Sequence, residues 1–591
     1  MSFCHRPVFR QILATSLLIL LLPLSSFAEE QQPNILIILS DDMGWADTGA
    51  FGGEIETPNI DQIAREGVRF VNFYTNPMCT PTRVTLMSGL DHHIAGAGTM
   101  TLFTAPNQQG KRGYEGWLLP DYKTLANIMQ EAGYNTYVSG KWDLGRFPEL
   151  IPTSRGFDRD FVMLDSHGSH YDMTNLYTDN PKLMFTEDGK YLTRLPKDYY
   201  SSKTYTDKMI SFIEEGRSNG KPFFAYLAYQ APHDPHHIDE PWRSKYQGKY
   251  DKGWTYFHRA RYSKQQALGL LPENSELAER YWYLPDSEVL APITLATLGR
   301  HMELYAAMMN NMDYHIGRLL EYLKEIGQYE NTVIIFFGDN GPEGNNTFEA
   351  ITASGLSNNI FRAKHWSQEH HINVLGTPNS YPEYGAGWAQ VSATPFYGHK
   401  SFPSEGGIRN ALIVKMPDSK HIGGTIRTDF MHVSDIMPTL TELTGQEFPN
   451  GDTSGKSWLG MLRDPAQHVR DEDDWIGWEI MGAMALRKGD WKILNNWPPY
   501  GTGNWQLYDL KSDWAERHDL AAVHPEILKE LISLYENQYM PNNNIILPNR
   551  AISESLWWNK PLRFPQFDNY PPGLYRQQYH PPPEMLAEPK E

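Results

Sequence analysis

The sequence predicts an α/β protein: a large mixed, mostly parallel sheet between layers of helices, followed by a smaller antiparallel sheet with one packed helix. Two observations predict this fold. Short apolar runs alternate with amphipathic helical segments through the first three quarters of the chain, and from about Trp475 short strands follow one another closely. Strand–helix–strand order is typical of a parallel sheet covered on both faces. A chain of 591 residues is long enough for both parts.

Five apolar runs in the larger part predict buried strands. They cover residues 34–39, 135–138, 222–229, 332–337 and 411–414. Residues 124–133 and 301–326 have the apolar spacing of amphipathic helices. Two long stretches, 234–300 and 341–399, begin where a predicted strand ends. Because ligands bind at the carboxyl ends of strands in open α/β sheets, we expect these stretches to form walls of a substrate pocket rather than surface decoration.

The last part of the chain has a different pattern. Short strands separated by Gly- and Pro-bearing turns are predicted at 475–481, 483–487, 491–494 and 505–510, with a helix at 525–539. After Pro541 the chain is rich in Pro, Asn and Tyr and is expected to be extended. The predicted parts are therefore a signal peptide (1–28), an α/β domain (29–470), a small antiparallel subdomain (471–540) and a Pro-rich tail (541–591).

The N-terminus predicts export. Arg6 and Arg10 precede an apolar run at 12–22, and Ser26-Phe27-Ala28 provides a small-x-small cleavage site. The run is short for a membrane span, which favours cleavage near Ala28 over an uncleaved anchor. We therefore expect a periplasmic or secreted protein with no stable membrane anchor. The formal charge of −19 argues against nucleic acid as a partner.

One cysteine, Cys79, remains after the predicted cleavage, because Cys4 lies in the signal peptide. A lone thiol in an exported chain forms no internal disulfide, so Cys79 is either a buried, inert side chain or a residue kept for chemistry. It begins the pentapeptide Cys79-Thr80-Pro81-Thr82-Arg83, and residues 83–88 have the pattern of a helix start. A nucleophile at a helix N-terminus meets unpaired backbone N–H groups that favour anions, which points to chemistry.

Oxygen-bearing side chains follow two of the predicted strands. Asp41 and Asp42 lie just after the strand at 34–39, and Asp339 and Asn340 lie just after the strand at 332–337. Singly, such residues are usually turns or helix caps. At two strand ends of one sheet they make an all-oxygen set suited to a hard divalent ion. Calcium is the predicted ion, with Mg²⁺ and Mn²⁺ as alternatives, and zinc is disfavoured because no His or Cys completes this set.

Three further residues are candidates for chemistry. Lys141 and His233 lie shortly after the strands at 135–138 and 222–229, and Lys400 lies in the Gly-rich stretch 397–409. Alone, a lysine is usually a solvated surface residue and a histidine is often a structural one. The placement of Lys141 and His233 after strands makes these two residues candidates for binding or proton transfer at the same edge of the sheet. Lys400 is a candidate by its position in the Gly-rich stretch.

Together these motifs resemble type I sulfatases of the alkaline phosphatase superfamily. Cys79-x-Pro81-x-Arg83 is similar to the signature of that family. The other motifs occur in the family's order, and they contain Asp41-Asp42, Lys141, His233, Asp339-Asn340 and Lys400. The segments that look most like bacterial periplasmic arylsulfatases are 90–100, 384–390 and 505–510. The likeness runs from about Pro33 to Tyr539 and implies an alkaline phosphatase-like sheet; the Pro-rich tail falls outside it.

The resemblance implies a sulfuric ester hydrolase that cleaves a sulfate monoester to an alcohol or phenol and sulfate. It implies that a maturation enzyme oxidises Cys79 to formylglycine, and that one hydroxyl of the hydrated aldehyde (a gem-diol) attacks sulfur. It implies that the divalent metal is held by Asp41, Asp42, Cys79 in its converted form, Asp339 and Asn340.

The resemblance also implies roles for the cationic residues. Arg83 holds the nucleophile, Lys141 and Lys400 bind the sulfate oxygens, and His233, with Lys400, protonates the leaving alcohol. The second hydroxyl then lets the sulfated residue release sulfate and return to the aldehyde. A serine would instead remain as a stable sulfate ester.

One position departs from the family's pattern. The family usually has Gly-Lys-Trp-His-Leu-Gly, whereas this chain has Asp143 in place of the histidine. That histidine is thought to act as a base on the second hydroxyl, and a carboxylate can also accept this proton. The cost is a further negative charge near three metal carboxylates. The hypothesis is that Asp143 serves as that base; the alternatives are altered specificity or a weakened enzyme.

Two other functions are alternatives to sulfate ester hydrolysis. Phosphonate or phosphate diester hydrolases share the metal set and the formylglycine. A degenerate, non-catalytic binding protein on the same scaffold is supported by Asp143 alone and opposed by Cys79, both lysines and His233. The high aromatic content, 13%, fits an aryl ester and a sulfated sugar equally well as substrate.

Overall fold

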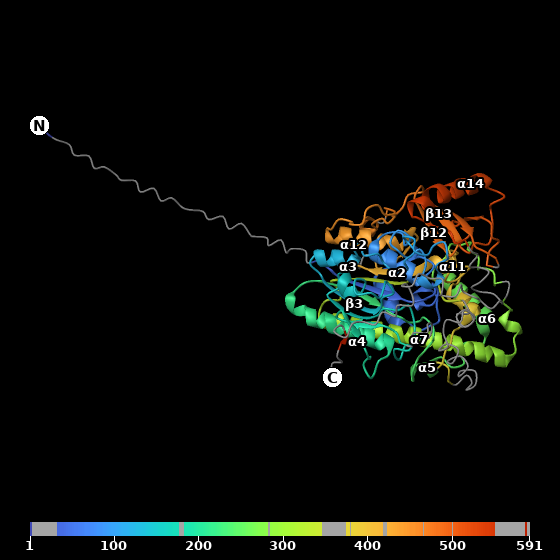
Figure 1. Ribbon diagram of the computed structural model, residues 1–591, viewed down its shortest axis with the longest axis horizontal. Helices are drawn as coiled ribbons and strands as arrows, with labels where there is room; N and C mark the ends of the chain where they lie inside the picture. Colours follow the sequence, from blue (N-terminus) through green and yellow to red (C-terminus); the bar gives the residue numbers. More distant parts are fainter. Residues whose placement is uncertain are drawn as a thin grey trace. The chain divides into compact units, whose positions relative to one another are not determined.

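The computed structural model describes residues 1–2, 32–175, 182–281, 284–344, 374–378, 380–417, 422–464, 466–498, 500–549 and 586–587. Met1–Gln32 and Pro33–Glu591 form two separate units, and the second holds the fold described below (Figure 1). The predicted signal peptide, most of the second long stretch and most of the Pro-rich tail lie outside the described residues. Within those residues, no helix has the length and apolar character needed to cross a membrane.

Twelve strands form the main sheet in the described part of the chain. Their order across the sheet is β10 (Ile426–Arg427), β2 (Val68–Tyr74), β9 (Arg409–Lys415), β8 (Thr332–Gly338), β1 (Asn34–Ser40), β7 (Phe223–Ala228), β3 (Asn135–Lys141), β4 (Arg159–Met163), β5 (Phe185–Glu187), β6 (Lys190–Leu192) and β16 (Leu586–Ala587). A further strand, β11 (Met431–His432), pairs with β2. All five predicted strands of this domain are present.

The centre of the sheet is parallel. Strands β8, β1, β7, β3 and β4 run in one direction, whereas β9 is antiparallel to β8 and β2. In β1, Leu39 pairs with Ala228 of β7 and Phe337 of β8, and Ser40 pairs with Gly338. The carboxyl ends of these strands therefore meet at one edge. The predicted mixed, mostly parallel sheet is confirmed.

Helices cover both faces of this sheet (Figure 1). The side chains of β1 point alternately to the two faces of the sheet. Leu36 and Ile38 belong to one apolar cluster, and Ile35, Ile37 and Leu39 belong to the other. The first cluster packs against α1 (Pro58–Glu66), α4 (Ser201–Gly216) and α7 (Pro292–Glu325). The second packs against α2 (Cys79–Ser88), α3 (Leu125–Glu131) and α12 (Ile436–Thr444).

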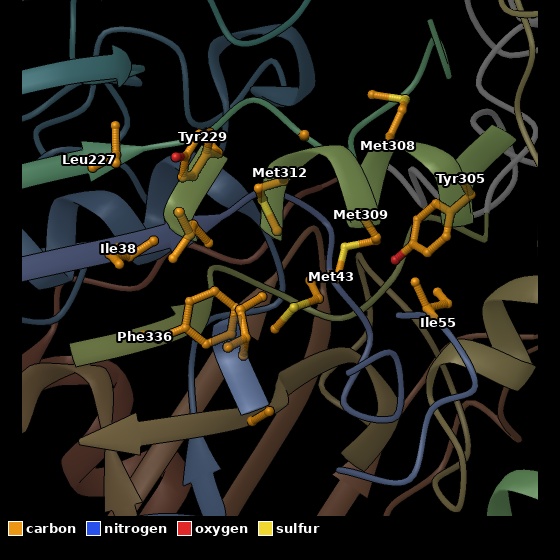
Figure 2. Packing of buried hydrophobic residues seen from close by; sticks show 14 of the residues in the cluster. Ile38, Met43, Ile55, Leu227, Tyr229, Tyr305, Met308, Met309, Met312 and Phe336 are labelled. Carbon is orange, nitrogen blue, oxygen red and sulfur yellow. The ribbon is translucent and has the colours of Figure 1, made fainter. Parts of the chain in front are cut away.

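Methionines of the long helix α7 fill the space above the central strands. Figure 2 shows Met312 pointing toward Phe336 of β8 and Met309 toward Met43, whereas Met308 lies on the other side of the helix; all belong to the same buried cluster. Flexible thioether side chains suit such irregular gaps between a helix and a sheet. The helix begins at Pro292, before the predicted 301, because proline is well tolerated in the first turn of a helix.

Shorter helices connect these elements. They are α5 (Trp242–Lys245), α6 (Gly253–Ala267), α10 (Gly385–Ser392), α11 (Glu405–Ile408), α13 (Leu459–Arg463) and α15 (Met540–Asn542). Helices α5 and α6 lie within the first predicted insertion, residues 234–300.

A separate four-stranded antiparallel sheet lies in the C-terminal part of the chain. Its strands, in order, are β12 (Trp475–Ile480), β13 (Ala483–Lys488), β14 (Trp491–Asn495) and β15 (Gln506–Asp509). The helix α14 (Pro525–Leu534) packs on it through Leu531 and continues into a π-helical turn at Tyr535–Tyr539. The prediction of one sheet with one packed helix is confirmed.

A buried histidine joins this small sheet to the main domain. The Nδ1 atom of His93 lies 2.8 Å from Asp91 Oδ1, and its Nε2 atom lies 2.9 Å from Glu479 Oε2 on β12. The hydroxyl of Tyr539 donates to Asp91 Oδ2 at 2.9 Å. Burial opposes the charged ring, but Asp91 and then Glu479 outweigh it and raise the pKa of His93 to about 9.

This contact predicts a pH-dependent stability. A folded-state pKa of about 9 exceeds the ordinary value of 6.5, so the stabilisation by charged His93 is complete below pH 6.5 and is lost as the pH rises through 9. We expect His93→Gln to lower the free energy of unfolding by about 3 kcal/mol at pH 6 and by much less at pH 10. Denaturant unfolding of both proteins at the two pH values measures this, and an equal loss at both would contradict a charged His93.

Candidate active site

The two acidic motifs meet where β1 and β8 end. The backbone N–H of Asp339 donates to Ser40 O at 3.0 Å, and that of Asp42 donates to Asp339 Oδ1 at 3.2 Å. Asp42 has a φ of 62°, in the left-handed region, so the chain turns sharply there. Asp41, Asp42, Asp339 and Asn340 are all buried. Parallel register thus brings residues about three hundred positions apart into one cluster.

Cys79 is the first residue of helix α2 and points at these carboxylates. Its Sγ atom lies 3.3 Å from Asp41 Oδ1 and 3.9 Å from Asp42 Oδ1. Burial, with Asp41 adding to it, raises the pKa of the Cys79 thiol well above its usual range. Lys141 and Lys400 oppose this shift without overcoming it. The unmodified side chain is therefore a neutral thiol and a poor nucleophile.

Each of the three carboxylates has its own cationic partner. The pairs are Lys141 Nζ with Asp41 Oδ2 at 2.7 Å, Lys400 Nζ with Asp42 Oδ2 at 2.9 Å and Arg83 Nη2 with Asp339 Oδ2 at 2.8 Å. Arg83 also donates to the backbone oxygen of Lys141 at 2.9 Å. Each of these three carboxylates is therefore compensated by a cation without an added ion. Desolvation would lower the pKa of Arg83, but the carboxylates raise it, so it stays charged.

The same cluster fits a divalent cation. Ligand atoms of Asp41, Asp42, Cys79 and His233 all lie within 4.8 Å of one another. The Oδ1 atom of Asn340 is buried and has no hydrogen-bond partner, while its Nδ2 atom donates to Asp42 Oδ1 at 2.7 Å. An orphaned acceptor beside three carboxylates is the donor chemistry of a hard oxygen-loving ion. The predicted metal residues are thus brought together.

His233 and Lys400 lie on the other side of Asp42. The Nε2 atom of His233 is 3.3 Å from Asp42 Oδ2 and 3.2 Å from Lys400 Nζ. Its Nδ1 atom is 2.7 Å from Asp234 Oδ1, which fixes the ring. Burial opposes the charged ring, but Asp42 outweighs it and raises the pKa of His233 to about 9, although Lys400 works against this. Without a bound cation, His233 is therefore a proton donor at neutral pH.

Asp143 is held beside the first turn of α2. Its Oδ2 atom accepts a hydrogen bond from Thr80 Oγ1 at 2.7 Å, and its Oδ1 atom accepts one from Ser166 Oγ. Its φ of 56° places it, like Asp42, in the left-handed region. The residue before Thr80 is Cys79, so Asp143 is tied to the neighbour of the candidate nucleophile. All the candidate site residues named from the sequence therefore lie in one neighbourhood.

Several supporting residues escape sequence reasoning. Thr80 and Ser166 bind Asp143, and the ring of His167 stacks on that of His233 with centroids 5.1 Å apart. Glu343 Oε2 lies 3.3 Å from Lys400 Nζ. Asp234 could have been found, because it follows His233 directly; Ser166 carries no motif that marks it.

Comparison with known proteins identifies the family. The family model described as Sulfatase matches residues 33–446. The chain belongs to the sulfatase family. It is 36% identical over 564 residues to an uncharacterized sulfatase of Schizosaccharomyces pombe, covering 91% of this chain and 98% of that one. It is 35% identical over 444 residues to an arylsulfatase of Klebsiella aerogenes, covering 74% and 91%.

Solved structures agree on the fold of this sulfatase. The crystal structure of Ps i-CgsB has a TM-score of 0.60 and 23% identity, and the match covers 88% of this chain and 94% of that one. That protein has also been solved in complex with k-i-k-neocarrahexaose. The chain is thus a hydrolase that acts on sulfuric esters, with the fold of the sulfatases.

Proposed function

We propose that this sulfatase cleaves a sulfate monoester with a formylglycine made from Cys79 and with one divalent ion, Ca²⁺. The single observation that carries the proposal is the placement of Cys79. It begins a helix, lies 3.3 Å from Asp41 and is buried among paired charges. Its raised pKa makes the bare thiol unsuited to attack, which supports conversion to an aldehyde.

The ion would be held by Asp41, Asp42, Asp339 and Asn340, together with residue 79. With residue 79 converted to formylglycine, every side chain of this set would offer oxygen, which favours Ca²⁺, with Mg²⁺ and Mn²⁺ as alternatives. Such an ion supplies Lewis-acid polarisation of the ester oxygens. The three carboxylates are each paired with a cation, so they do not repel an anion as bare carboxylates would. A bound divalent ion adds two positive charges to the site, which favours an anionic ester in an otherwise acidic protein.

The chain's cationic side chains would bind and protonate the ester. Lys141 and Lys400 can turn from Asp41 and Asp42 toward the sulfate oxygens once an ion neutralises the carboxylates. Arg83 orients the nucleophile through Asp339 and the backbone of Lys141. His233 lies next to Lys400, and these two donors would protonate the leaving oxygen.

Asp143 is proposed as the base that takes the proton of the second hydroxyl on residue 79. Its carboxylate is buried beside Thr80, which fixes its orientation. We expect Asp143→Asn to lower turnover of an aryl sulfate by about 10²- to 10⁴-fold, because the amide cannot accept that proton. Sulfated residue 79 should then accumulate and be visible in the mass of its peptide. Unchanged turnover with no accumulation would contradict this role.

Processing and location are also proposed. We infer that the signal peptide is cleaved near Ala28 and that the mature enzyme is periplasmic or secreted, which the Arg-bearing start, the apolar run and the small-x-small site support. A maturation enzyme that oxidises Cys79 is then the required partner. The arylsulfatase of Klebsiella aerogenes supports an aryl sulfate as the first substrate to test. The saccharide complex of Ps i-CgsB makes a sulfated sugar the second.

The test is the dependence of turnover on the state of residue 79. The protein is expressed with and without a formylglycine-generating enzyme, loaded with Ca²⁺, and assayed on an aryl sulfate. Peptide mass gives the fraction of aldehyde in each preparation. We expect turnover to rise in proportion to that fraction. Equal turnover in preparations with and without the aldehyde would overturn the proposal, and full aldehyde without turnover of any sulfate ester would favour a non-catalytic protein.

A further inference from the structure

The segment that carries Lys400 is packed tightly against the other active-site loops. This segment, residues 397–408, is called the Lys400 loop below. The backbone N–H of Lys400 donates to Pro342 O at 3.0 Å, and that of Ser401 donates to Pro77 O at 2.8 Å. Gly341 N–H donates to Gly407 O at 2.9 Å. The loop thus binds the backbone on either side: just before Cys79 and just after Asn340.

The backbone of the Lys400 loop lies very close to neighbouring backbone. A Cβ atom on Gly407 would lie 2.0 Å from Phe402 O, and one on Gly341 would lie 2.0 Å from Gly406 O. Only glycine at these two positions allows the backbone to approach this closely. The Lys400 loop therefore packs backbone to backbone against itself and against the segment after Asn340. Ser401 has a φ of 77°, a strained conformation that the surroundings must hold. Whatever fixes the end of this loop therefore fixes Lys400.

The small C-terminal sheet fixes that end. Lys492 on β14 is fully buried, and its Nζ atom lies 2.8 Å from Glu405 Oε1 at the start of α11. The same ammonium lies 2.8 Å from Glu516 Oε1, and Glu516 Oε2 accepts the backbone N–H of Glu405 at 2.9 Å. One cation thus bridges two buried carboxylates, one of which belongs to the Lys400 loop.

A second, uncharged contact joins the same two parts. Asn496, next to the end of β14, donates from Nδ2 to Ser404 Oγ at 2.7 Å, and both residues are buried. Adjacent residues Ser404 and Glu405 are therefore both bound by the small sheet. Glu405 Oε2 also accepts from Tyr74 at 2.7 Å, so the loop end is held from the main sheet as well.

We propose that Lys492 of the C-terminal sheet is a positioning residue for Lys400, acting through Glu405 and the Lys400 loop. The proposal rests on the proposed role of Lys400 in sulfate binding and leaving-group protonation. It gives the small sheet a part in the reaction: it is the support that holds a cationic side chain within 2.9 Å of Asp42 and 3.2 Å of His233. Displacement of such a group by about 1 Å is enough to cost about a hundredfold in rate.

The test is a double-mutant cycle between Lys492 and Lys400. We expect Lys492→Met to lower kcat for an aryl sulfate between about ten- and a hundredfold and to raise KM, because Lys400 both binds the sulfate group and helps to protonate the leaving oxygen. In a Lys400→Ala background the same substitution should change kcat by less than about twofold, because its target is gone. Lys492→Arg should recover most of the loss. An equal loss in both backgrounds would overturn the proposal.

The matched control is Glu479→Gln on β12. Glu479 is a buried charge that also joins the small sheet to the main domain, through His93, but it does not contact the Lys400 loop. The Glu479→Gln variant should have a lower unfolding temperature, as Lys492→Met does, but an unchanged kcat. If Glu479→Gln lowers kcat as much as Lys492→Met, the effect is general loosening and the proposal fails.

Two further measurements keep the test decisive. Lys492→Met removes the cation between Glu405 and Glu516, although Glu405 keeps Arg409 at 3.1 Å. If that variant does not fold, Asn496→Ala breaks the uncharged contact instead and should act in the same direction. Calorimetry of inorganic sulfate binding gives the same cycle without turnover. Sulfate affinity should fall with Lys492→Met only when Lys400 is present. A protein that binds sulfate in this pattern but turns over no ester would support the positioning and contradict the proposed function alone.

Discussion

Replacement of Cys79 by alanine is expected to abolish turnover of sulfate esters. The residue occupies the point where helix α2 begins and the carboxylates of Asp41 and Asp42 converge, 3.3 Å and 3.9 Å from Sγ. No other described side chain of the cluster can be converted to an aldehyde. Nucleophilic catalysis is thereby removed, and the loss should reach about 10⁶-fold or the detection limit, as for other enzymes that lose their nucleophile. The measurement is the steady-state rate with an aryl sulfate.

The Cys79→Ser variant distinguishes the role of the nucleophile from the role of the second hydroxyl. With Cys79→Ser shown by peptide mass to be unmodified, we expect at most one equivalent of phenol per protein, because a simple sulfate ester lacks the second oxygen needed for its release. The unfolding temperature of both variants should match the parent, since the thiol contributes only weak hydrogen bonds. Cys79→Ala should bind Ca²⁺ more weakly than the parent, because it loses one of the proposed metal ligands. Multiple turnovers by Cys79→Ala would contradict the assignment of the nucleophile.

Removal of the divalent ion is expected to abolish activity while leaving the protein folded. Three carboxylates converge in the site, but Lys141, Lys400 and Arg83 pair with them at 2.7, 2.9 and 2.8 Å. Each of these three carboxylates therefore keeps a cationic partner in the metal-free protein, so loss of the ion leaves none of them uncompensated. Without the ion, both lysines stay bound to Asp41 and Asp42 and are not free for sulfate. Chelation followed by an aryl sulfate assay and circular dichroism measures both effects.

The loss of stability on removal of the ion follows from its binding equilibrium. Loss of an ion present at 100 to 1,000 times its dissociation constant removes about 3 to 4 kcal/mol of stability, which lowers the unfolding temperature without unfolding the protein at 25 °C. Readdition of Ca²⁺ should restore activity in full. Asp339→Asn should weaken Ca²⁺ binding and remove the 2.8 Å ion pair of Arg83, which keeps a longer contact to Asp41 Oδ1 at 3.7 Å. Full activity after chelation, with metal analysis showing no divalent ion, would contradict the assigned metal site.

The strands that the sequence predicts best are those buried on both faces. Strands β1, β7 and β8 are uninterrupted apolar runs, and every residue in them is buried. Strand β2 escapes this pattern because Arg69 and Asn72 interrupt it. Its position depends on antiparallel pairing with β9 and on parallel pairing with β10 and β11, which only the tertiary fold supplies.

The active-site residues also divide into those that the sequence predicts and those that depend on the tertiary fold. Asp41, Asp42, Asp339 and Asn340 could be predicted because strand ends are visible in the sequence and parallel strands end at one edge. Ser166 and Lys492 could not, because no sequence motif marks either residue and each acts through a contact that only the tertiary fold supplies. Lys492 lies in a different sheet from the chemistry, and a lysine on a short strand is ordinarily read as exposed. Its burial between Glu405 and Glu516 is visible only in the structure.

The measurement that tests the central claim most directly is the ratio of kcat/KM for an aryl sulfate to that for the matching aryl phosphate diester. The protein should be loaded with Ca²⁺ and shown by peptide mass to carry the aldehyde at position 79. We expect a clear preference for the sulfate. A preference for the diester would contradict sulfate monoester hydrolysis as the proposed reaction and place the enzyme with the phosphonate and phosphate diester hydrolases.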